Sequence, residues 1–390
     1  MNLINICDDY AFHLFLVISW TLAFILILHL GSRKSITGPR STFDSISVVV
    51  VGCGLPKKSM GWYHVDQLQK MTTSNANVVS IVEPYFVSLG DKAPRSWLNF
   101  VSSNPQITFV ESVSDLPPFP PTTLCLIATR ARDSPAMFEA CLDNGAKCIF
   151  LEKPGAESVS ALRRMRELAK ARTIPCRIFV GYNKNVTEYV KKTLKEGKNG
   201  HIEFVHNNSY AIEELGECFE RNSEGMLKNM AIHELALLVN FFGIRVDTLK
   251  SIEVDKENSI QLKIGKITDF SKVRFTMTSL AGISATVTAD RCGGNVSHGI
   301  VRNPATMEEI RRFSMPASEQ EESQIAYKCL HDPEMMPYFF VNSDDYWTLK
   351  MKVIKAFRGD FVENDVASID VAIEALRLAE YATSVISKQL

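Results

Sequence analysis

The chain has 390 residues, of which 46% are hydrophobic and 22% charged, and its formal net charge is -1 at pH 7. This composition is ordinary for a globular protein, and the length predicts two domains, because a single core rarely extends over so many residues. The near-zero charge excludes a general electrostatic attraction to nucleic acids. The nine cysteines are scattered and form no Cys-x-x-Cys pair, so neither a metal site nor a disulfide framework is expected.

Residues 11–30, AFHLFLVISWTLAFILILHL, contain no Asp, Glu, Lys or Arg. A helix of this length reaches about 30 Å, the thickness of a bilayer core. Two aspartates precede the run and Arg33, Lys34 and Arg40 follow it, which places the C-terminal bulk in the cytosol by the positive-inside bias. We therefore expect residues 1–45 to form a hydrophobic membrane-anchoring helix and a linker. The alternative is a cleaved segment that directs the chain to the secretory pathway or to another compartment.

Strand patterns alternate with helical patterns from residue 46 onward. The strand patterns are ISVVVVG, NVVSIVEP, TTLCLIATR and KCIFLEKP, and the helical patterns are MGWYHVDQLQKM, SPAMFEACLDNG and SVSALRRMRELAKAR. Apolar strands that alternate with helices form parallel sheets covered on both faces, so this part of the chain predicts an α/β domain.

The pattern changes after about residue 200. A strand, IEFVHNNSYA, is followed by the helix GMLKNMAIHELALLVNFFG, and residues 247–290 then read as four alternating strands without intervening helices. This succession predicts an antiparallel sheet with one exposed face. A final helix, with apolar residues at helical spacing over 369–379, is expected to pack against the body of the protein. The aromatic stretch MPYFFVNSDDYW before it is expected in the core or in a dimer contact.

The first strand runs into a glycine-rich turn, VVVVGCGLPKKSMGWYH, at Val48 to His64. Gly52 and Gly54 fit the first two positions of a dinucleotide-binding loop, where backbone must approach a pyrophosphate at a helix N-terminus. Gly61 fits the third position if LPKKSM lengthens the loop, and the two lysines of that insertion then reach phosphate oxygens. A turn that merely contains glycines is the alternative, since such a match is weak evidence alone.

The second strand ends in Glu83, 22 residues after Gly61. An acidic side chain at this position hydrogen-bonds the adenosine ribose hydroxyls of NAD. Because no arginine follows in EPYFV to accept a 2′-phosphate, the sequence favours NAD over NADP.

The stretch IATRARDSPAMFEACLDNGAKCIFLEKPGAESVSALRRMRELA resembles the Gfo/Idh/MocA family of sugar and cyclitol oxidoreductases, through its Glu-Lys-Pro triplet after a strand. The similarity includes VGYNKNV and GMLKNMAIHELALLVNFFG and covers roughly residues 46–295. It implies a doubly wound Rossmann domain over 46–180 and, over 181–390, a C-terminal α+β domain with an open, mainly antiparallel sheet. The glycine loop is then an insertion in a known type of cofactor site.

The resemblance also implies roles for particular side chains and an oligomeric state. It implies that residues after the later strands line the cofactor, namely Thr129, Arg130, Glu152 and Lys153. It further implies a homo-oligomer, either a dimer or a tetramer.

Several positions depart from the family pattern. Arg130 stands where members usually have Pro, and Ser134 where they often have His. The common motif Asp-x-x-x-His-x-x-Asp reads Asn229-x-x-x-His233 here, with Ala236 last. Asn in the first place is similar to members acting on nucleotide-linked amino sugars, and it argues against a mechanism that needs a carboxylate there.

The chemistry expected is hydride transfer between nicotinamide and a secondary alcohol of a sugar, nucleotide sugar or cyclitol. Lys153, at a strand end, is expected to hold the substrate hydroxyl, and His233 to take its proton. Asn229 is expected on the same helix face as His233, where it orients the substrate or the imidazole. Tyr182 and Asn183 are expected to line the pocket.

Two other functions stay open. One is a glycosidase that uses tightly bound NAD for transient oxidation. The other is a non-catalytic NAD-binding sensor or regulator, which the missing carboxylates favour, although the retention of Lys153 and His233 opposes it.

Overall fold

The structure is a computed structural model that describes residues 45–390. No helix in this described part is long and apolar enough to cross a membrane. The hydrophobic helix and the linker predicted at the N-terminus lie outside the described residues, so the anchor stays a prediction.

Six parallel strands form the first sheet, in the order β3-β2-β1-β4-β5-β6. The strands are β1 (Ile46–Val51), β2 (Ala76–Val82), β3 (Thr108–Val110), β4 (Thr123–Ile127), β5 (Cys148–Leu151) and β6 (Arg177–Val180). The apolar runs of β1, β4 and β5 are buried on both faces, as the sequence predicts for a parallel sheet. The strand order reverses between β1 and β4, and ligands of such sheets bind outside the strand ends at this point.

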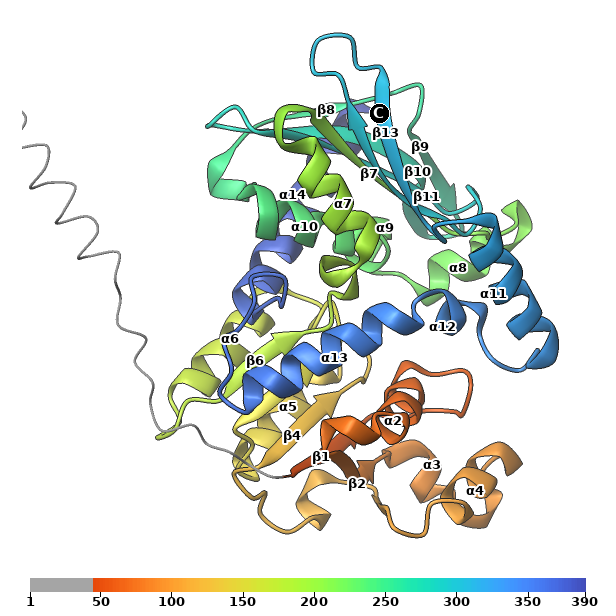
Figure 1. The fold of residues 1–390 in the computed structure, drawn as a ribbon, viewed down its shortest axis with the longest axis vertical. Coiled ribbons are helices and arrows are strands. Elements are labelled where there is room, and N and C mark those ends of the chain that lie inside the picture. Colours follow the sequence, from red (N-terminus) through yellow and green to blue (C-terminus); the bar gives the residue numbers. More distant parts are fainter. Residues whose placement is uncertain (1–44) are drawn as a thin grey trace, which may run out of the picture. The chain divides into compact units, whose positions relative to one another are not determined.

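Helices connect these strands (Figure 1). They are α2 (Met60–Lys70), α3 (Pro84–Ser88), α4 (Arg95–Ser102), α5 (Ser134–Asp143) and α6 (Val159–Lys170). In α6 the side chain of Ser158 accepts a hydrogen bond from the Ala161 amide and caps the helix, while Leu162 and Met165 are buried. The predicted doubly wound domain is confirmed.

The second sheet has the order β13-β12-β7-β11-β10-β8, with β9 paired to β10. Its strands are β7 (His201–Asn207), β8 (Leu249–Val254), β9 (Ile260–Ile264), β10 (Ile267–Ser279), β11 (Ser284–Asp290), β12 (Ser297–Arg302) and β13 (Glu309–Met315). All neighbours are antiparallel except β7 and β11, which are parallel. The sheet is therefore mixed, and mainly antiparallel as expected.

Helices α7 (Glu188–Glu196), α8 (Leu215–Arg221), α9 (Met226–Asn229), α10 (Ile232–Phe242) and α14 (Ile369–Gln389) accompany this sheet. The apolar face of α14 packs against α10 and also against α6 of the first domain. The last helix thus packs against the body of the protein, and it ties the two sheets together.

Three further helices, α11 (Glu319–His331), α12 (Pro337–Val341) and α13 (Ser343–Phe357), follow the second sheet. Phe339, Leu349 and Val353 from this segment are buried in the same core as Val48 and Val50 of β1. Phe339 and Tyr346 of the aromatic stretch are therefore core residues that pack on the first sheet, although the stretch follows the second sheet in the chain (Figure 1), whereas Met336 of the same stretch is exposed.

Candidate active site

In the glycine loop between β1 and α2, backbone segments pack closely against one another. Gly52 has a φ of 83°, and a Cβ at this residue would lie 2.6 Å from the Thr129 side chain. A Cβ at Gly61 would collide with the Gly52 carbonyl oxygen, so only glycine lets the start of α2 approach β1. Gly54 also has a positive φ, of 68°. These backbone features fit a loop that brings main chain against a pyrophosphate, and they favour the insertion over a mere turn.

Glu83 follows β2 and lies beside this loop. Its side chain is buried, and its Oε2 accepts a hydrogen bond of 2.7 Å from the Gly54 amide. The carboxylate is thus held at the carboxyl edge of the sheet, where a ribose would need it.

Lys57 of the insertion forms ion pairs with the C-terminal segment of the chain. Lys57 Nζ lies 2.8 Å from Asp332 Oδ1 and 3.5 Å from Glu334 Oε2. The expectation that Lys57 reaches phosphate is therefore corrected, because its ammonium already binds the carboxylates between α11 and α12. The Met336 amide also donates to the Lys57 carbonyl, at 3.1 Å. The insertion docks the C-terminal segment onto the glycine loop.

Thr129 and Arg130 follow β4, and Lys153 follows β5. The three residues line one cavity of about 610 Å³, together with Asn229 from the second domain. Thr129 Oγ1 lies 3.0 Å from Ser134 Oγ, which fixes the turn into α5. We call this space the cofactor-side cavity, since it lies at the strand ends next to the order reversal.

Lys153 points away from its own strand toward α9. Its ammonium donates a 3.0 Å hydrogen bond to the Asn229 carbonyl oxygen. Burial lowers the pKa of Lys153, while the charges of Glu152 and Glu224 oppose the shift. A buried ammonium of this kind attracts a developing alkoxide strongly, because little water screens it.

The Glu152 carboxylate is hydrogen-bonded to another side chain of the protein. Its Oε1 lies 2.9 Å from His64 Nε2, and His64 Nδ1 lies 2.8 Å from Lys350 Nζ. Burial and the Lys350 charge lower the pKa of His64 to about 4, so the imidazole is neutral. This row of groups connects α2, the Glu-Lys-Pro turn and α13.

His233 is the second residue of α10 and is almost fully buried. Its ring lies edge-on to Tyr182 and to His206, with centroid distances of 5.9 and 6.3 Å. Burial, followed by the charges of Lys153 and Lys184, lowers the pKa of His233 well below 6.5. The imidazole is therefore neutral, and its Nδ1 bonds no described residue. It is available to accept a proton.

Asn229 and His233 do not share one helix. The predicted helix is interrupted, because α9 ends at Asn229 and α10 begins at Ile232. The Asn229 carbonyl, which a continuous helix pairs with the His233 amide, binds Lys153 instead. The Asn229 side chain donates to Glu224 Oε1 at 2.7 Å. Asn229 thus contacts Lys153 through its main chain, and the same-face expectation is wrong.

The sequence analysis did not predict a buried ion pair that lies beside His233. Lys184 Nζ lies 2.6 Å from Glu234 Oε1 and 3.1 Å from Ser297 Oγ, and His206 Nδ1 lies 3.2 Å from Glu234 Oε2. Burial raises the pKa of Glu234, but Lys184 and His206 outweigh it and hold the pKa well below normal. The available signal was a glutamate inside the apolar run IHELALLV, where a charge needs a partner.

A small cavity of about 40 Å³ opens beside His233, and we call it the inner cavity. Lys184, His206, Ser297 and Asn342 line it with His233. The two residues expected to line the pocket lie one layer behind it. Tyr182 packs on the His233 ring, and Asn183 Nδ2 donates to Asn342 Oδ1 at 3.2 Å.

Comparison with known proteins supports the fold. Residues 46–182 match the GFO_IDH_MocA model, described as an oxidoreductase family with an NAD-binding Rossmann fold, and this match supports, for the first domain, the resemblance recognised in the sequence. Among curated proteins none matches the chain significantly.

Solved structures of low identity share the whole architecture. A myo-inositol dehydrogenase from Lactobacillus casei, in complex with NAD(H) and myo-inositol, has a TM-score of 0.61 at 15% identity over 89% of this chain and 96% of its own. The scyllo-inositol dehydrogenase of the same organism, with NAD(H) and scyllo-inositol, has a TM-score of 0.62 at 13% identity. The match covers 88% of this chain and 98% of its own. A UDP-N-acetylglucosamine 3-dehydrogenase from Acidithiobacillus ferrooxidans has a TM-score of 0.59 at 12% identity, and the match covers 86% of this chain and 96% of its own. At these identities the likeness establishes the fold.

Proposed function

We propose that this chain, whose Rossmann domain is that of the Gfo/Idh/MocA oxidoreductase family, is an NAD-dependent dehydrogenase of a sugar-like or cyclitol secondary alcohol. The observation that carries the proposal is a neutral, buried His233 with a free ring nitrogen, whose pKa is lowered by burial and then by the charge of the Lys153 ammonium. A base and a cation in this relation suit the removal of a proton from an alcohol.

The cofactor is held by residues of the first domain. Gly52, Gly54 and Gly61 shape the loop for the pyrophosphate, and the buried Glu83 carboxylate accepts from the ribose hydroxyls. Arg130 lines the cofactor-side cavity. Bound NAD supplies the acceptor for the hydride of the alcohol carbon. A 2′-phosphate would meet the Glu83 carboxylate, so NADP is the less favoured cofactor.

The chain's own residues handle the proton. Lys153 binds the substrate oxygen and stabilises negative charge that develops on it, because its buried ammonium is poorly screened. His233 accepts the hydroxyl proton on its free nitrogen. The Asn229 carbonyl positions Lys153 through their 3.0 Å hydrogen bond. Glu234 stabilises the imidazolium that results, since its charge opposes the lowering of the His233 pKa.

The substrate class rests on the neighbours with the same fold. Two of them are described with bound inositols and a third as acting on a nucleotide sugar. Substrates of these kinds share a ring carbon that bears a secondary hydroxyl, and we propose the same feature for the substrate of this chain.

The experiment is a panel of inositols, free sugars and nucleotide sugars incubated with the full chain and NAD. Accumulation of reduced nicotinamide supports a dehydrogenase. Sugar release without it supports the NAD-dependent glycosidase, and tight NAD binding without turnover supports the sensor. Equal or better affinity for NADP than for NAD would contradict the role given to Glu83.

The membrane anchor at residues 11–30 and the homo-oligomer belong to the proposal as well. Removal of the run should release the protein from membranes and leave NAD binding intact, which fractionation and titration measure. The oligomeric state follows from light scattering.

A further inference from the structure

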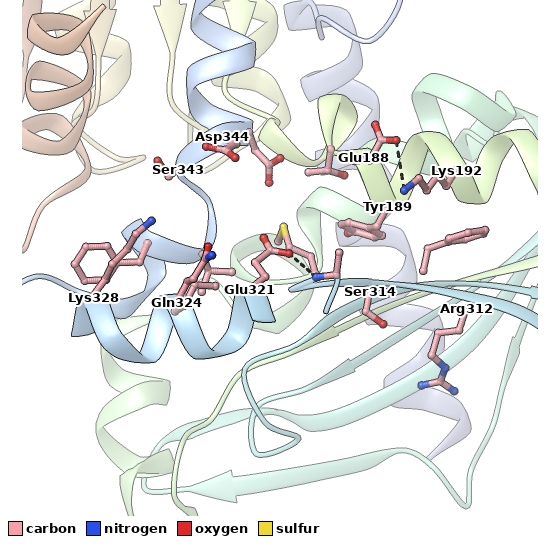
Figure 2. A pocket seen from close by; sticks show the side chains of 18 residues that line it. Glu188, Tyr189, Lys192, Arg312, Ser314, Glu321, Gln324, Lys328, Ser343 and Asp344 are labelled. Carbon is pink, nitrogen blue, oxygen red and sulfur yellow. Dashed lines mark hydrogen bonds and ion pairs between the residues drawn. The ribbon is translucent and has the colours of Figure 1, made fainter. Parts of the chain in front are cut away.

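A second cavity of about 370 Å³ lies beside the inner cavity, and we call it the outer cavity. It opens between the start of α7, the end of β13, α11 and the start of α13 (Figure 2). Met315 and Val341 line both cavities. The two spaces therefore share a wall.

Electrostatic interactions also connect the cavities. The pKa of Asp345, which lines the outer cavity, is raised to about 7 by burial and by Asp344, and Lys184 of the inner cavity opposes this shift. The pKa of Tyr189 is raised by burial and by the charges of Glu234 and Asp345. Tyr189 thus interacts electrostatically with a member of the inner ion pair and with an outer carboxylate.

Four buried polar atoms without hydrogen-bond partners belong to described residues that line these two cavities. Among the described residues, Asn207 Oδ1 and His233 Nδ1 belong to the inner cavity, and Tyr189 Oη and Asp345 Oδ2 to the outer one. Tyr189 is only 4% exposed, and its ring extends from α7 into the space that faces α11 and α13 (Figure 2). Buried polar atoms normally have partners, so the walls of the two cavities hold polar groups with unused hydrogen-bonding capacity.

The charges of the outer cavity disfavour an anionic ligand. Its carboxylates are Glu188, Glu321, Asp344 and Asp345, against the cations Lys192, Arg312 and Lys328. Lys192 lies 3.6 Å from Glu188, and Arg312 lies 2.6 Å from Glu309, so two of the three cations are already paired. A phosphate site needs converging free cations, and the described residues offer Lys328 for that role.

The starts of α7 and α13 face the same cavity, and helix N-termini attract anions. Each, however, carries acidic residues in its first turn, Glu188 in α7 and Asp344 and Asp345 in α13. These carboxylates already complement the positive ends of the two helices. The two helix N-termini therefore add little to the affinity of this cavity for a nucleoside diphosphate.

We infer that the outer cavity is a second substrate subsite that binds a neutral, polyhydroxylated unit, such as a second sugar ring, joined to the unit that reacts beside His233. The inference rests on the proposed function for the place of the reacting carbon. The outer cavity, at about 370 Å³, falls within the roughly 300–1,000 Å³ of ligand pockets, whereas the inner cavity, at about 40 Å³, has room for a single hydroxyl-sized group of the reacting unit.

The test measures binding by calorimetry with the full chain loaded with NAD. The probes are glucose and myo-inositol, the disaccharides maltose, cellobiose and trehalose, and UDP-glucose. A net hydrogen bond changes a binding constant by roughly 2- to 12-fold, so two of them in the outer cavity should make at least one disaccharide bind about 10-fold tighter than glucose.

Two tryptophan variants separate the cavity from the surface of α11. Gln324 lines the outer cavity, whereas its neighbour Ser323 is exposed and does not. Gln324→Trp should abolish the advantage of the disaccharide over glucose, and Ser323→Trp should leave that advantage unchanged. Tyr189→Phe, which removes one hydroxyl, should reduce it by roughly 2- to 12-fold.

Equal binding of disaccharides and glucose, tightest binding of UDP-glucose, or no binding of any disaccharide would each overturn the inference. Formation of reduced nicotinamide is followed in parallel and bears on the proposed function alone. A disaccharide that binds as expected, together with no reduced nicotinamide formed from any probe, would remove the dehydrogenase and keep the subsite.

Discussion

The ion pair beside His233 allows a sharp test of the active-site electrostatics. Lys184 and Glu234 are 2.6 Å apart, with side-chain exposures of 5% and 0%. Lys184→Met removes the ammonium and keeps most of the side-chain volume. The Glu234 carboxylate then retains His206, at 3.2 Å, as its remaining side-chain hydrogen-bond partner among the described residues, and burial lowers the pKa of that imidazole, so it supplies little counter-charge. Removing one member of a buried ion pair costs about 3–5 kcal/mol, so we expect a loss of that order.

Urea denaturation measures this loss as a change in the free energy of unfolding. The double variant Lys184→Met/Glu234→Gln should recover most of it, since no uncompensated charge remains. Lys195→Met, at an exposed position of α7, is the matched control and should stay within about 0.5 kcal/mol of the native protein.

The same variant has a second, functional readout. Lys184 contributes to the lowered pKa of His233, so its removal should raise that pKa. The acidic limb of the pH-rate profile should move toward higher pH. A Lys184→Met protein as stable as the native one, with an unshifted profile, would refute the reasoning.

Three further predictions concern the cofactor, the base and the outer cavity. His233→Ala should lower turnover by about 10²–10⁴-fold and leave the NAD dissociation constant unchanged, as steady-state kinetics and titration would show; normal turnover would remove the assignment. Glu83→Gln should weaken NAD binding by roughly 10-fold and narrow the preference over NADP, which parallel titrations measure. Asp345 keeps its proton to a pH of about 7 in the folded protein, against 3.8 ordinarily, so the native protein loses stability as pH rises through this window. Asp345→Asn should therefore gain stability over the native protein between pH 4 and pH 7, by at most about 4 kcal/mol, and a pH-independent difference in urea denaturation would contradict this.

The first domain could be predicted because its signals are local. Four of its six strands, β1, β2, β4 and β5, stand in the sequence as short apolar runs, whereas β3 and β6 were not predicted. The glycines that shape the loop after β1 stand in the sequence beside it. The Glu-Lys-Pro triplet marks the end of β5 in the same direct way. Local patterns of this kind survive in the fold because tertiary contacts reinforce them.

The missed features depend on distant contacts. The break after Asn229 has no Gly or Pro to announce it, since the run MLKNMAIHELALLVNFF favours helix throughout. The break coincides with the bond from Lys153, which is 76 positions away in the chain. Lys184 meets Glu234 across 50 positions and Ser297 across 113. The role of Lys57 depended on Asp332, 275 positions away. No periodicity records such pairings.

The central claim is that Lys153 and His233 perform NAD-dependent oxidation of a ring alcohol. The most direct measurement is the absorbance of reduced nicotinamide when the full chain, NAD and the substrate panel are combined, with Lys153→Ala and His233→Ala beside it. We predict accumulation with at least one inositol, sugar or sugar conjugate, and a loss of about 10²–10⁴-fold in each variant. A protein that binds NAD but reduces none of it with any member of the panel would contradict the account.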